Sequence, residues 1–331
     1  MAVFLLRRFW ALIITLLGGF TIMFVLFFAL PDDPAVLIAG GNARAVNPQV
    51  VENTRIRLGL DKPLYQQYFI RLGETITLSA KSFKTQEPVR DMLAERLPNS
   101  LRLAFWAVAI ESVFGIGAGV ISARRRNSVS DWLTTTAAVV LSAIPVFVLG
   151  YLLKQVTGVY AYEHDIGWLR LPTLGLGPDE WYLWVIPSVE QLKYLIQPAL
   201  ILASVSTAII ARLTRTTMLE AAGSDHVRTA TAKGLKPRLV VRRHTLRNAL
   251  IPVVTYIGID IGTLVGAAIL TETVFNWPGL GSKIANAAAE RDFPVMLTLS
   301  MAVILVYGLA SLAVDITYAW LDPRIRLGAA A

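Results

Sequence analysis

Residues 225–254 read DHVRTATAKGLKPRLVVRRHTLRNALIPVV, which is the most basic run in a chain that is otherwise rich in apolar residues. Apolar segments long enough to cross a membrane lie on both sides of it, at 194–213 and 250–271. Lys and Arg concentrate in the cytoplasmic loops of membrane proteins. The stretch therefore raises two questions: on which side of a membrane it lies, and what it does there.

The composition is that of a membrane protein. Of 331 residues, 55% are hydrophobic and only 16% are charged, a balance outside the usual range of soluble domains. A net charge of +8 would also suit nucleic-acid binding, but that function requires the basic residues to share one folded face. Their positions indicate membrane topology instead, so no nucleic acid is expected as a partner. The chain has no Cys, which excludes disulfides and Cys-ligated metals.

Six segments are apolar enough to cross about 30 Å of hydrocarbon as helices of roughly 20 residues. They lie at 9–30, 101–122, 132–153, 194–213, 250–271 and 296–320. The first is about twice as long as the apolar core of a signal peptide, so we expect a retained signal anchor.

The basic flanks of these segments predict the orientation of the chain. With the N-terminus in the cytoplasm, every cytoplasmic flank is basic: Arg7 and Arg8, residues 124–126, the loop 214–249, and Arg324 and Arg326. The sequence therefore predicts an all-α membrane protein with six transmembrane helices and cytoplasmic N and C termini.

Segment 31–100 is too polar to cross a membrane, but it carries helix start and stop signals. Asn47 with Pro48 starts one short helix that Gly59 ends, Pro63 starts another that Gly73 ends, and Pro88 opens a third. We expect this external segment to lie on the outer membrane surface. It would serve there either as a structural cap over the first helix or as part of a docking surface for an external partner.

The basic stretch itself predicts two helices at an angle. Ser224 or Asp225 can cap a short helix that Gly234 ends, and Pro237 stands where a second helix takes its first turn. The second helix is expected to run from the membrane surface into the fifth span. The first, with its small residues, would protrude into the cytoplasm.

Within this stretch, RTA at 228–230 and AKGL at 232–235 precede a basic run, His244, LRN at 246–248 and ALIP at 249–252. This order resembles the cytoplasmic EAA loop of ATP-binding-cassette (ABC) importer permeases of the dipeptide, oligopeptide and nickel family, in the first-permease-subunit type. Further matches follow the family's order over nearly the whole chain: LPDDP at 30–34, GLDKPL at 59–64, WPGLG at 277–281, RDFP at 291–294 and DPRIR at 322–326. The family's external GDLG-x-S turn is represented only by TLSAKS at 77–82.

The resemblance implies a type I ABC importer permease fold with a large external segment after the first helix. The implied domains are 1–96 for the signal anchor and external segment, 97–320 for the permease transmembrane domain, and 321–331 for a cytoplasmic tail. It further implies that the protruding helix 225–234 is a coupling helix that docks on an ATPase subunit. The residues implied in coupling are Asp225, Val227, Arg228, Thr229, Ala230, Ala232, Lys233, Gly234, Leu235, His244, Arg247 and Asn248.

The implied function is ATP-driven import of di- or oligopeptides across the bacterial inner membrane, with nickel or another small solute as an alternative. The implied partners are a homologous second permease subunit, two nucleotide-binding ATPase subunits or domains, an external solute-binding protein, membrane lipid and the peptide itself. The chain has no GxxxxGK[ST] phosphate loop. We therefore expect no bound cofactor in this chain, with ATP and Mg²⁺ on the partner subunits. No metal is expected, because His164, His226 and His244 fall on different sides or in different elements, and no enzyme activity is expected, because no nucleophile has a base partner.

Two acidic residues fall near the middle of predicted spans, where a charge is costly and is a candidate for function. Glu111 and Asp260 could meet the ammonium group of a peptide, or they could pair with polar groups inside the protein. A more distant alternative is a proton-coupled secondary transporter that uses both as a relay, for which inverted repeats and discontinuous helices would be expected. Gly258, Gly262 and Gly266 repeat every four residues in the fifth span, which predicts a smooth face for close helix packing or sliding in the translocation pathway.

Overall fold

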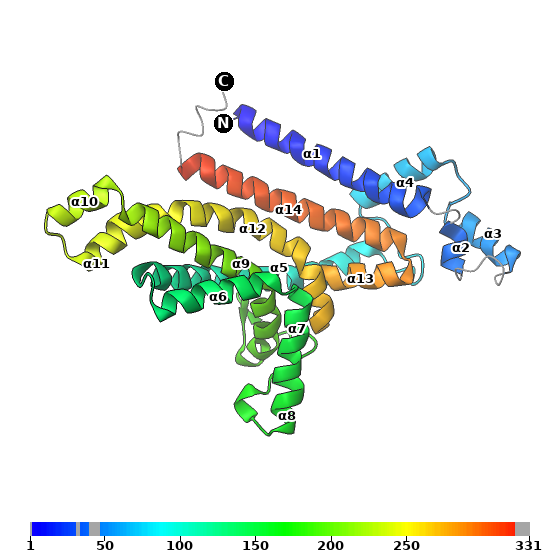
Figure 1. The fold of residues 1–331 in the computed structure, drawn as a ribbon. Helices are drawn as coiled ribbons and strands as arrows, with labels where there is room; N and C mark the ends of the chain where they lie inside the picture. Colours follow the sequence, from blue (N-terminus) through cyan, green and yellow to red (C-terminus); the bar gives the residue numbers. More distant parts are fainter. Residues whose placement is uncertain (1, 31–33, 40–46, 322–331) are drawn as a thin grey trace. The chain divides into compact units, whose positions relative to one another are not determined.

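The computed structural model describes residues 2–30, 34–39 and 47–321, and its regular structure is almost entirely helical (Figure 1). Contacts divide the chain into two compact units, residues 1–100 with 278–331 and residues 101–277. The domains expected from sequence, 1–96, 97–320 and 321–331, follow chain order rather than contacts, and they stay a prediction. Most of the LPDDP motif and all of the DPRIR motif lie outside the described residues.

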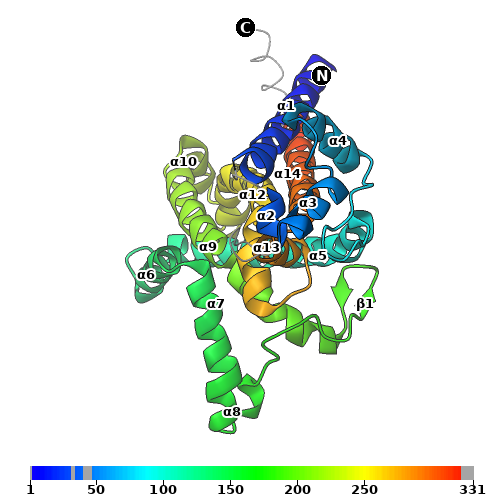
Figure 2. The same cartoon turned by 90° about the vertical axis from the view of Figure 1, so that its right-hand side faces the viewer.

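The first unit is built around an antiparallel pair, α1 and α14, which lie side by side in Figures 1 and 2. Its elements are α1 (Ala2–Phe24), the π-helical turn η1 (Val25–Ala29), α2 (Pro34–Ala39), α3 (Pro48–Arg57), α4 (Leu64–Ile76), the start of α5 (Val89–Arg124), α13 (Leu280–Glu290) and α14 (Phe293–Leu321). The two helices approach closely at Gly308, where an added Cβ would stand 2.1 Å from a methyl carbon of Leu12.

Aromatic side chains four residues apart form the core of this unit. Phe20, Phe24 and Phe28 are buried along one stripe of α1 and η1. The ring of Tyr68 on α4 lies edge-on to Phe20 and Phe24, with centroids 5.3 Å away in each case. Phe293 at the start of α14 packs against Phe28 at 5.7 Å. The segment between α1 and α5 is therefore held to the first helix by a shared apolar core.

A polar contact closes the same unit. Asp292, between α13 and α14, accepts hydrogen bonds from the hydroxyl of Ser82 and from the backbone N–H of Phe83, the latter at 3.0 Å. Ser82 also accepts from the N–H groups of Lys84 and Thr85. The loop before α5 is thereby tied to a residue more than two hundred positions away in the sequence.

In the second unit, the long helix α9 lies at the centre, with α12, α6 and α7 packed around it. The elements are the remainder of α5, α6 (Val129–Ala143), α7 (Val146–Lys154), the π-helical η2 (Gln155–Tyr160), α8 (Ala161–Glu163), the 3-10 turn η3 (Gly167–Leu169), β1 (Trp181–Tyr182), β2 (Ile186–Pro187), α9 (Val189–Ala222), α10 (Asp225–Ala232), α11 (Pro237–Leu239), the π-helical η4 (Val240–Thr245) and α12 (Leu246–Phe275). Figure 2 shows α7, η2 and α8 as one column.

Small residues let α5 approach α9 closely. A Cβ built at Gly115 would lie 2.7 Å from Ile210, and one built at Gly119 would lie 2.5 Å from Thr214. Both glycines therefore stand where only a bare backbone fits, which is the small-xxx-small pattern of close helix packing in membranes.

A short antiparallel hairpin follows α8 in the chain and is fixed to α5. Trp181 pairs with Pro187 and Tyr182 with Ile186. The guanidinium of Arg102 stacks on the ring of Trp181 at 4.6 Å, a cation–π contact that stabilises the hairpin against the helix.

Within the described residues, five helices are long and apolar enough to cross a membrane. They are Leu6–Ala29, Val89–Arg124, Val189–Ala222, Pro237–Phe275 and Phe293–Val314, and a bent pair of shorter helices would supply a sixth. Each of the six segments expected from sequence lies within or largely overlaps one of these.

The expected helix over 132–153 is not continuous. The chain breaks between α6 and α7, and the two axes differ by 104°. Ile144 has extended backbone and precedes Pro145, whose ring disfavours helical geometry in the residue before it. The expectation of one straight helix here was wrong, and the bent pair, Val129–Ala143 with Val146–Glu163, extends beyond the expected limit of 153.

One expected helix end is absent, because α4 runs through Gly73 to Ile76. Helix α5 runs through Pro98 as one helix of 36 residues. The proposed domain limit at 96/97 therefore falls inside a helix. After Pro98, Asn99 donates to the carbonyl of Pro278 at 3.0 Å and Ser100 accepts from the N–H of Leu280 at 2.8 Å. These tertiary bonds stabilise the helix where proline removes one backbone bond.

Candidate functional site

Helix α10 has the boundaries that its sequence predicts. Ser224 stands at the N-cap in extended conformation and Asp225 occupies the first turn. Gly234 follows the C-cap with φ of +72°, a left-handed conformation that favours glycine. Pro237 then begins α11. The chain reverses sharply here, and α10 lies at one end of the second unit, next to the last turns of α9 (Figure 1).

Two sets of contacts seat α10 on the helical segment that follows it. Val227 and Ala230 of α10 form a buried apolar cluster with Val240 of η4. On the neighbouring side, Nδ2 of Asn248 lies 2.9 Å from Nε2 of His226 and donates to the carbonyl oxygen of His244 at 3.1 Å. One face of the short helix is therefore fixed to η4 and the start of α12.

The seat turns Ala230 inward. This residue is among those implied in coupling, and its side chain is only 4% exposed and faces Val227 and Val240. The opposite face of α10 carries Asp225, Arg228, Thr229 and Ala232, all exposed. Helical geometry explains the division, because residues three and four apart share a face. We call this set of four residues the outer face of α10.

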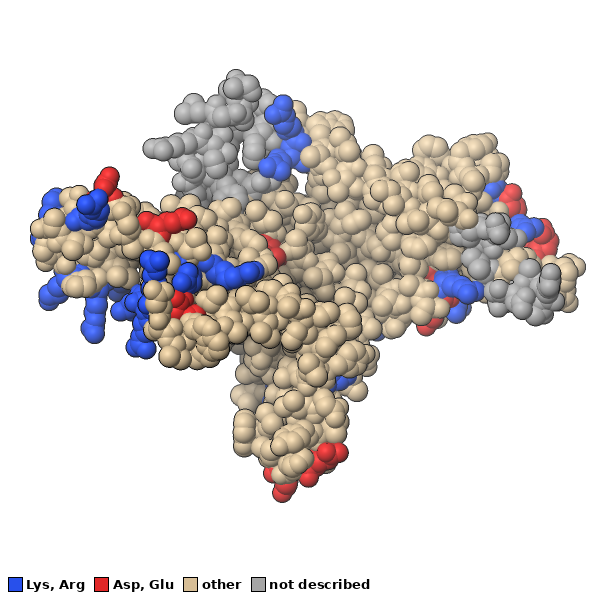
Figure 3. Space-filling model, viewed as in Figure 1, with Lys and Arg blue, Asp and Glu red and all other residues tan. Residues whose placement is uncertain are grey.

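The remaining residues expected in coupling lie in two places, the turn after α10 and the junction of η4 with α12. Lys233, Gly234 and Leu235 are exposed in the turn after α10. At the base, His244 contributes its carbonyl oxygen to the seat, and the side chain of Arg247 is exposed. Figure 3 shows Lys and Arg side chains gathered at the end of the second unit where α10, α11 and η4 lie.

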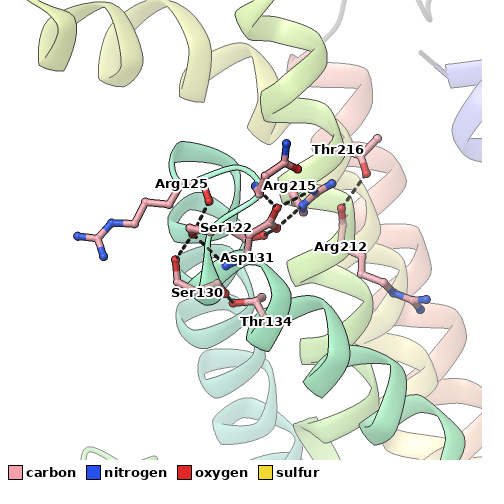
Figure 4. Close-up of polar contacts among 10 residues, drawn as sticks. Ser122, Arg125, Ser130, Asp131, Thr134, Arg212, Arg215 and Thr216 are labelled. Carbon is pink, nitrogen blue, oxygen red and sulfur yellow. Dashed lines mark hydrogen bonds and ion pairs between the residues drawn. The ribbon is translucent and has the colours of Figure 1, made fainter.

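A buried polar cluster lies between the ends of α5, α6 and α9. The guanidinium of Arg215 donates to both carboxylate oxygens of Asp131, at 2.7 and 2.9 Å. The hydroxyl of Ser122 and the N–H of Asn127, the latter at 2.9 Å, donate to the same carboxylate. In Figure 4, Arg215 points from α9 toward Asp131, whereas Arg125 points away from the cluster. Four donors on one carboxylate lock three helix ends together.

Glu111 of α5 and Asp260 of α12 face each other inside the second unit, beside Ser206 and Tyr256. Glu111 is fully buried and Asp260 is 9% exposed. Thr263 donates to Oδ1 of Asp260 at 2.6 Å. Within the described part of the chain, both oxygens of Glu111 and Oδ2 of Asp260 have no hydrogen-bond partner. The structure thus brings together two acids that lie on separate helices, and their like charges repel unless a proton or cation lies between them.

The three glycines of α12 differ in their surroundings. Gly262 is buried and Gly258 is partly buried. A Cβ built at Gly266 would meet no atom within 4 Å among the described residues. Close approach of α5 to α9 occurs at Gly115 and Gly119, and a role of the α12 glycines in the pathway stays a prediction.

Sequence reasoning missed three features of this region. It did not identify the Asp131–Arg215 cluster, the role of His226 in seating α10, or the glycine pair of α5. Only the glycine pair of α5 could have been recognised from sequence, because its two glycines are four residues apart, as are the glycines of α12. The ionic partners are separated by 84 positions, and no local pattern connects them.

Comparison with known proteins assigns both parts of the chain to one kind of transport system. The family model described as "Binding-protein-dependent transport system inner membrane component" matches residues 115–327. The model for the N-terminal part of the membrane component of such systems matches residues 1–104.

Curated relatives extend over almost the full length. The chain is 38% identical over 338 residues to the di/tripeptide transport system permease protein DppB of Pseudomonas aeruginosa, with 98% of each chain covered. It is 34% identical over 342 residues to the dipeptide transport system permease protein DppB of Alkalihalophilus pseudofirmus, covering 98% of this chain and 100% of the relative. It is 38% identical over 324 residues to the glutathione transport system permease protein GsiC of Escherichia coli, with 98% of each chain covered.

Proposed function

Because the chain belongs to the family of binding-protein-dependent transport system inner membrane components, we propose that it is the permease subunit of an ATP-driven peptide importer. It is a multi-pass protein of the bacterial inner membrane and forms half of the translocation pathway. A homologous second permease, two ATPase subunits or domains and an external solute-binding protein complete the assembly. ATP and Mg²⁺ bind to the ATPase partners.

The observation that carries this proposal is the geometry of α10. A short helix is held between two long helices, α9 and α12, and is seated firmly along one face while its outer face is exposed. Such an element transmits a rigid-body movement of a docked partner into the helical bundle. ATP binding draws two such coupling helices together and opens the pathway outward, and hydrolysis resets it inward.

Peptides are the substrate class that the relatives support. Their printed names specify dipeptides, di- and tripeptides, and glutathione, so nickel is not favoured. The test is reconstitution of the complete assembly in vesicles with its binding protein. We expect uptake of a labelled dipeptide that requires ATP and the binding protein. Uptake driven by a pH gradient without nucleotide would overturn the assignment in favour of a secondary transporter.

We also propose six transmembrane helices, with α6 and α7 as one broken span, both termini in the cytoplasm and residues 31–100 outside. The chain has no Cys, so single Cys residues report topology without background. Lys84 and Lys236 are exposed.

Lys84→Cys is expected to react with an impermeant maleimide in intact cells, whereas Lys236→Cys is expected to react only after permeabilisation. The reason is the positive-inside rule, which places the basic loop around Lys236 in the cytoplasm. Labelling is read from the mass of the purified chain. The orientation is wrong if both variants, or Lys236→Cys alone, react in intact cells.

Glu111 and Asp260 are proposed to contribute to the pathway by receiving the ammonium group of the peptide. Asp260→Asn is then expected to reduce uptake of a dipeptide roughly tenfold, a typical effect of losing one charged hydrogen bond, while the requirement for ATP remains. Thr263→Val is the matched control, since it removes the hydroxyl bonded to Oδ1 and leaves the charge. Equal uptake by Asp260→Asn and the unmodified protein would restrict this pair to a packing role.

A further inference from the structure

A groove of about 530 Å³ runs along the first turns of the helical segment that enters α12. Its lining combines three leucines and three arginines: Leu239, Leu246, Leu250, Arg242, Arg243 and Arg247. The groove lies entirely within the second unit and is distinct from the outer face of α10. No acidic side chain contributes to its lining.

The three guanidinium groups are exposed, and within the described residues none of them takes part in an ion pair or a side-chain hydrogen bond. Arg243 and Arg247 are one helical turn apart, so they project on the same side, and Arg242 is adjacent. Three neighbouring cations repel one another unless an anion lies between them. Guanidinium groups match phosphate oxygens through paired N–H donors, so a phosphate is the anion that this arrangement fits.

The leucines add an apolar floor to the same groove. Leu246 and Leu250 are four residues apart and follow the arginines toward the middle of α12, and both are partly exposed. Leu239 closes the opposite end and is 42% exposed. A ligand that covers this surface therefore needs an anionic part beside the arginines and an apolar part that extends along the helix toward Leu250.

The length of the helix places the groove at a membrane interface. The helical stretch Pro237–Phe275 has 39 residues, whereas about 20 residues cross the hydrocarbon. Most of the residues not needed to cross the hydrocarbon precede residue 250, at the basic end of the stretch where the groove lies. With the basic flanks on the cytoplasmic side, an orientation that rests on the proposed function, the arginines lie at the level of the cytoplasmic headgroups and Leu250 lies at the edge of the hydrocarbon.

We propose that this groove binds one anionic phospholipid of the cytoplasmic leaflet. Its phosphate lies between Arg243 and Arg247, with Arg242 beside it, and an acyl chain lies on Leu246 and Leu250. The bound lipid neutralises the arginines of η4 and early α12, the helical segment on which α10 is seated. The position of this segment thereby becomes sensitive to the lipid composition of the membrane.

The test measures lipid binding directly. The complete complex, purified in mild detergent and stripped of lipid, is titrated with phosphatidylglycerol or phosphatidylcholine and analysed by native mass spectrometry. The unmodified complex is expected to retain one phosphatidylglycerol with clear preference over phosphatidylcholine. R243Q/R247Q is expected to weaken that binding about thirtyfold, the effect of removing two interfacial basic residues.

The matched control is R125Q/R126Q, which removes the same charge from another exposed basic flank that lines no part of this groove. It is expected to leave phosphatidylglycerol binding unchanged. Leu250→Asn is expected to weaken retention of phosphatidylglycerol while leaving the arginines in place.

Equal loss in both arginine variants would overturn the proposal, because it would indicate a general charge effect. Equal binding of the two lipids, or competition by millimolar inorganic phosphate, would also overturn it. Release of the ATPase subunits by R243Q/R247Q with lipid retention unchanged would identify the groove as a protein interface instead. These measurements use neither peptide nor ATP, so their outcome is separate from the test of import.

Discussion

Replacing Asp131 with alanine is expected to uncouple ATP hydrolysis from peptide uptake. The carboxylate is 6% exposed and joins α6 to α9 through two bonds from Arg215. Its removal leaves a guanidinium without its partner and frees the end of α9, which leads directly into α10. We expect uptake per ATP hydrolysed to fall roughly tenfold, within the range by which residues between two coupled sites alter coupling. The thermal midpoint of the complex should also fall by several degrees.

The measurement is the ratio of labelled peptide imported to phosphate released in reconstituted vesicles. Glu190→Ala is the matched control, because it removes a carboxylate from an exposed ion pair with Lys193 on the same helix α9, and exposed pairs contribute little. Asp131→Asn should be intermediate, since its single amide oxygen can still accept from either Ser122 or Asn127, which bond different oxygens of the carboxylate. If Asp131→Ala has an unchanged ratio of imported peptide to released phosphate and an unchanged thermal midpoint, the cluster does not contribute to coupling.

The length and apolarity of the helices were predictable from sequence, because burial in lipid imposes a long apolar run on each segment. Whether a given proline breaks a helix was not predictable from sequence. Pro98 lies inside a continuous helix, whereas Pro145 follows a sharp break. The difference comes from tertiary contacts, since Asn99 and Ser100 are bonded to the chain around residues 278–280. Such contacts between distant residues leave no trace in a local pattern.

The limits of α10 were predictable because they depend on local sequence signals. A left-handed glycine and a first-turn proline act on the backbone beside them, so Gly234 and Pro237 specify where the helix ends and where the next begins. Which face of α10 is outward depends instead on Val240, a residue of the following segment. Ala230 and Ala232 are equivalent in sequence, and only the seat distinguishes the buried one from the exposed one.

This difference changes what a substitution in α10 tests. Ala230→Glu would bury a carboxylate between Val227 and Val240, and a buried charge without a partner strongly destabilises its surroundings. We expect it to release α10 from its seat and to abolish uptake. Gly234→Pro should do the same, because proline cannot adopt the observed φ of +72°. In both variants the cause lies inside this chain.

Ala232→Glu is expected to abolish uptake in a different way. Its side chain lies on the exposed outer face beside Arg228 and Thr229, so the new carboxylate leaves α10 intact. If the ATPase subunit docks on this face, the larger charged side chain must be desolvated there even when it pairs with Arg228 one turn away, and association should weaken by about 2 kcal/mol or more, at least about thirtyfold. Co-purification of the ATPases with the tagged permease measures this loss. Thr231→Glu, an exposed position on the flank of the same helix, is the matched control and should retain both ATPases and uptake.

Limited proteolysis of the permease without ATPases separates the two mechanisms. Ala230→Glu should be cut within residues 225–236, because a helix released from its seat exposes its backbone to proteases, whereas Ala232→Glu should resist cleavage as the unmodified chain does. If Ala232→Glu keeps its ATPases and its uptake while Ala230→Glu loses both, the outer face is not the docking surface, and α10 serves only to hold η4 in place. If Ala232→Glu loses the ATPases without becoming protease-sensitive, the docking surface is located on the face that the seat leaves exposed.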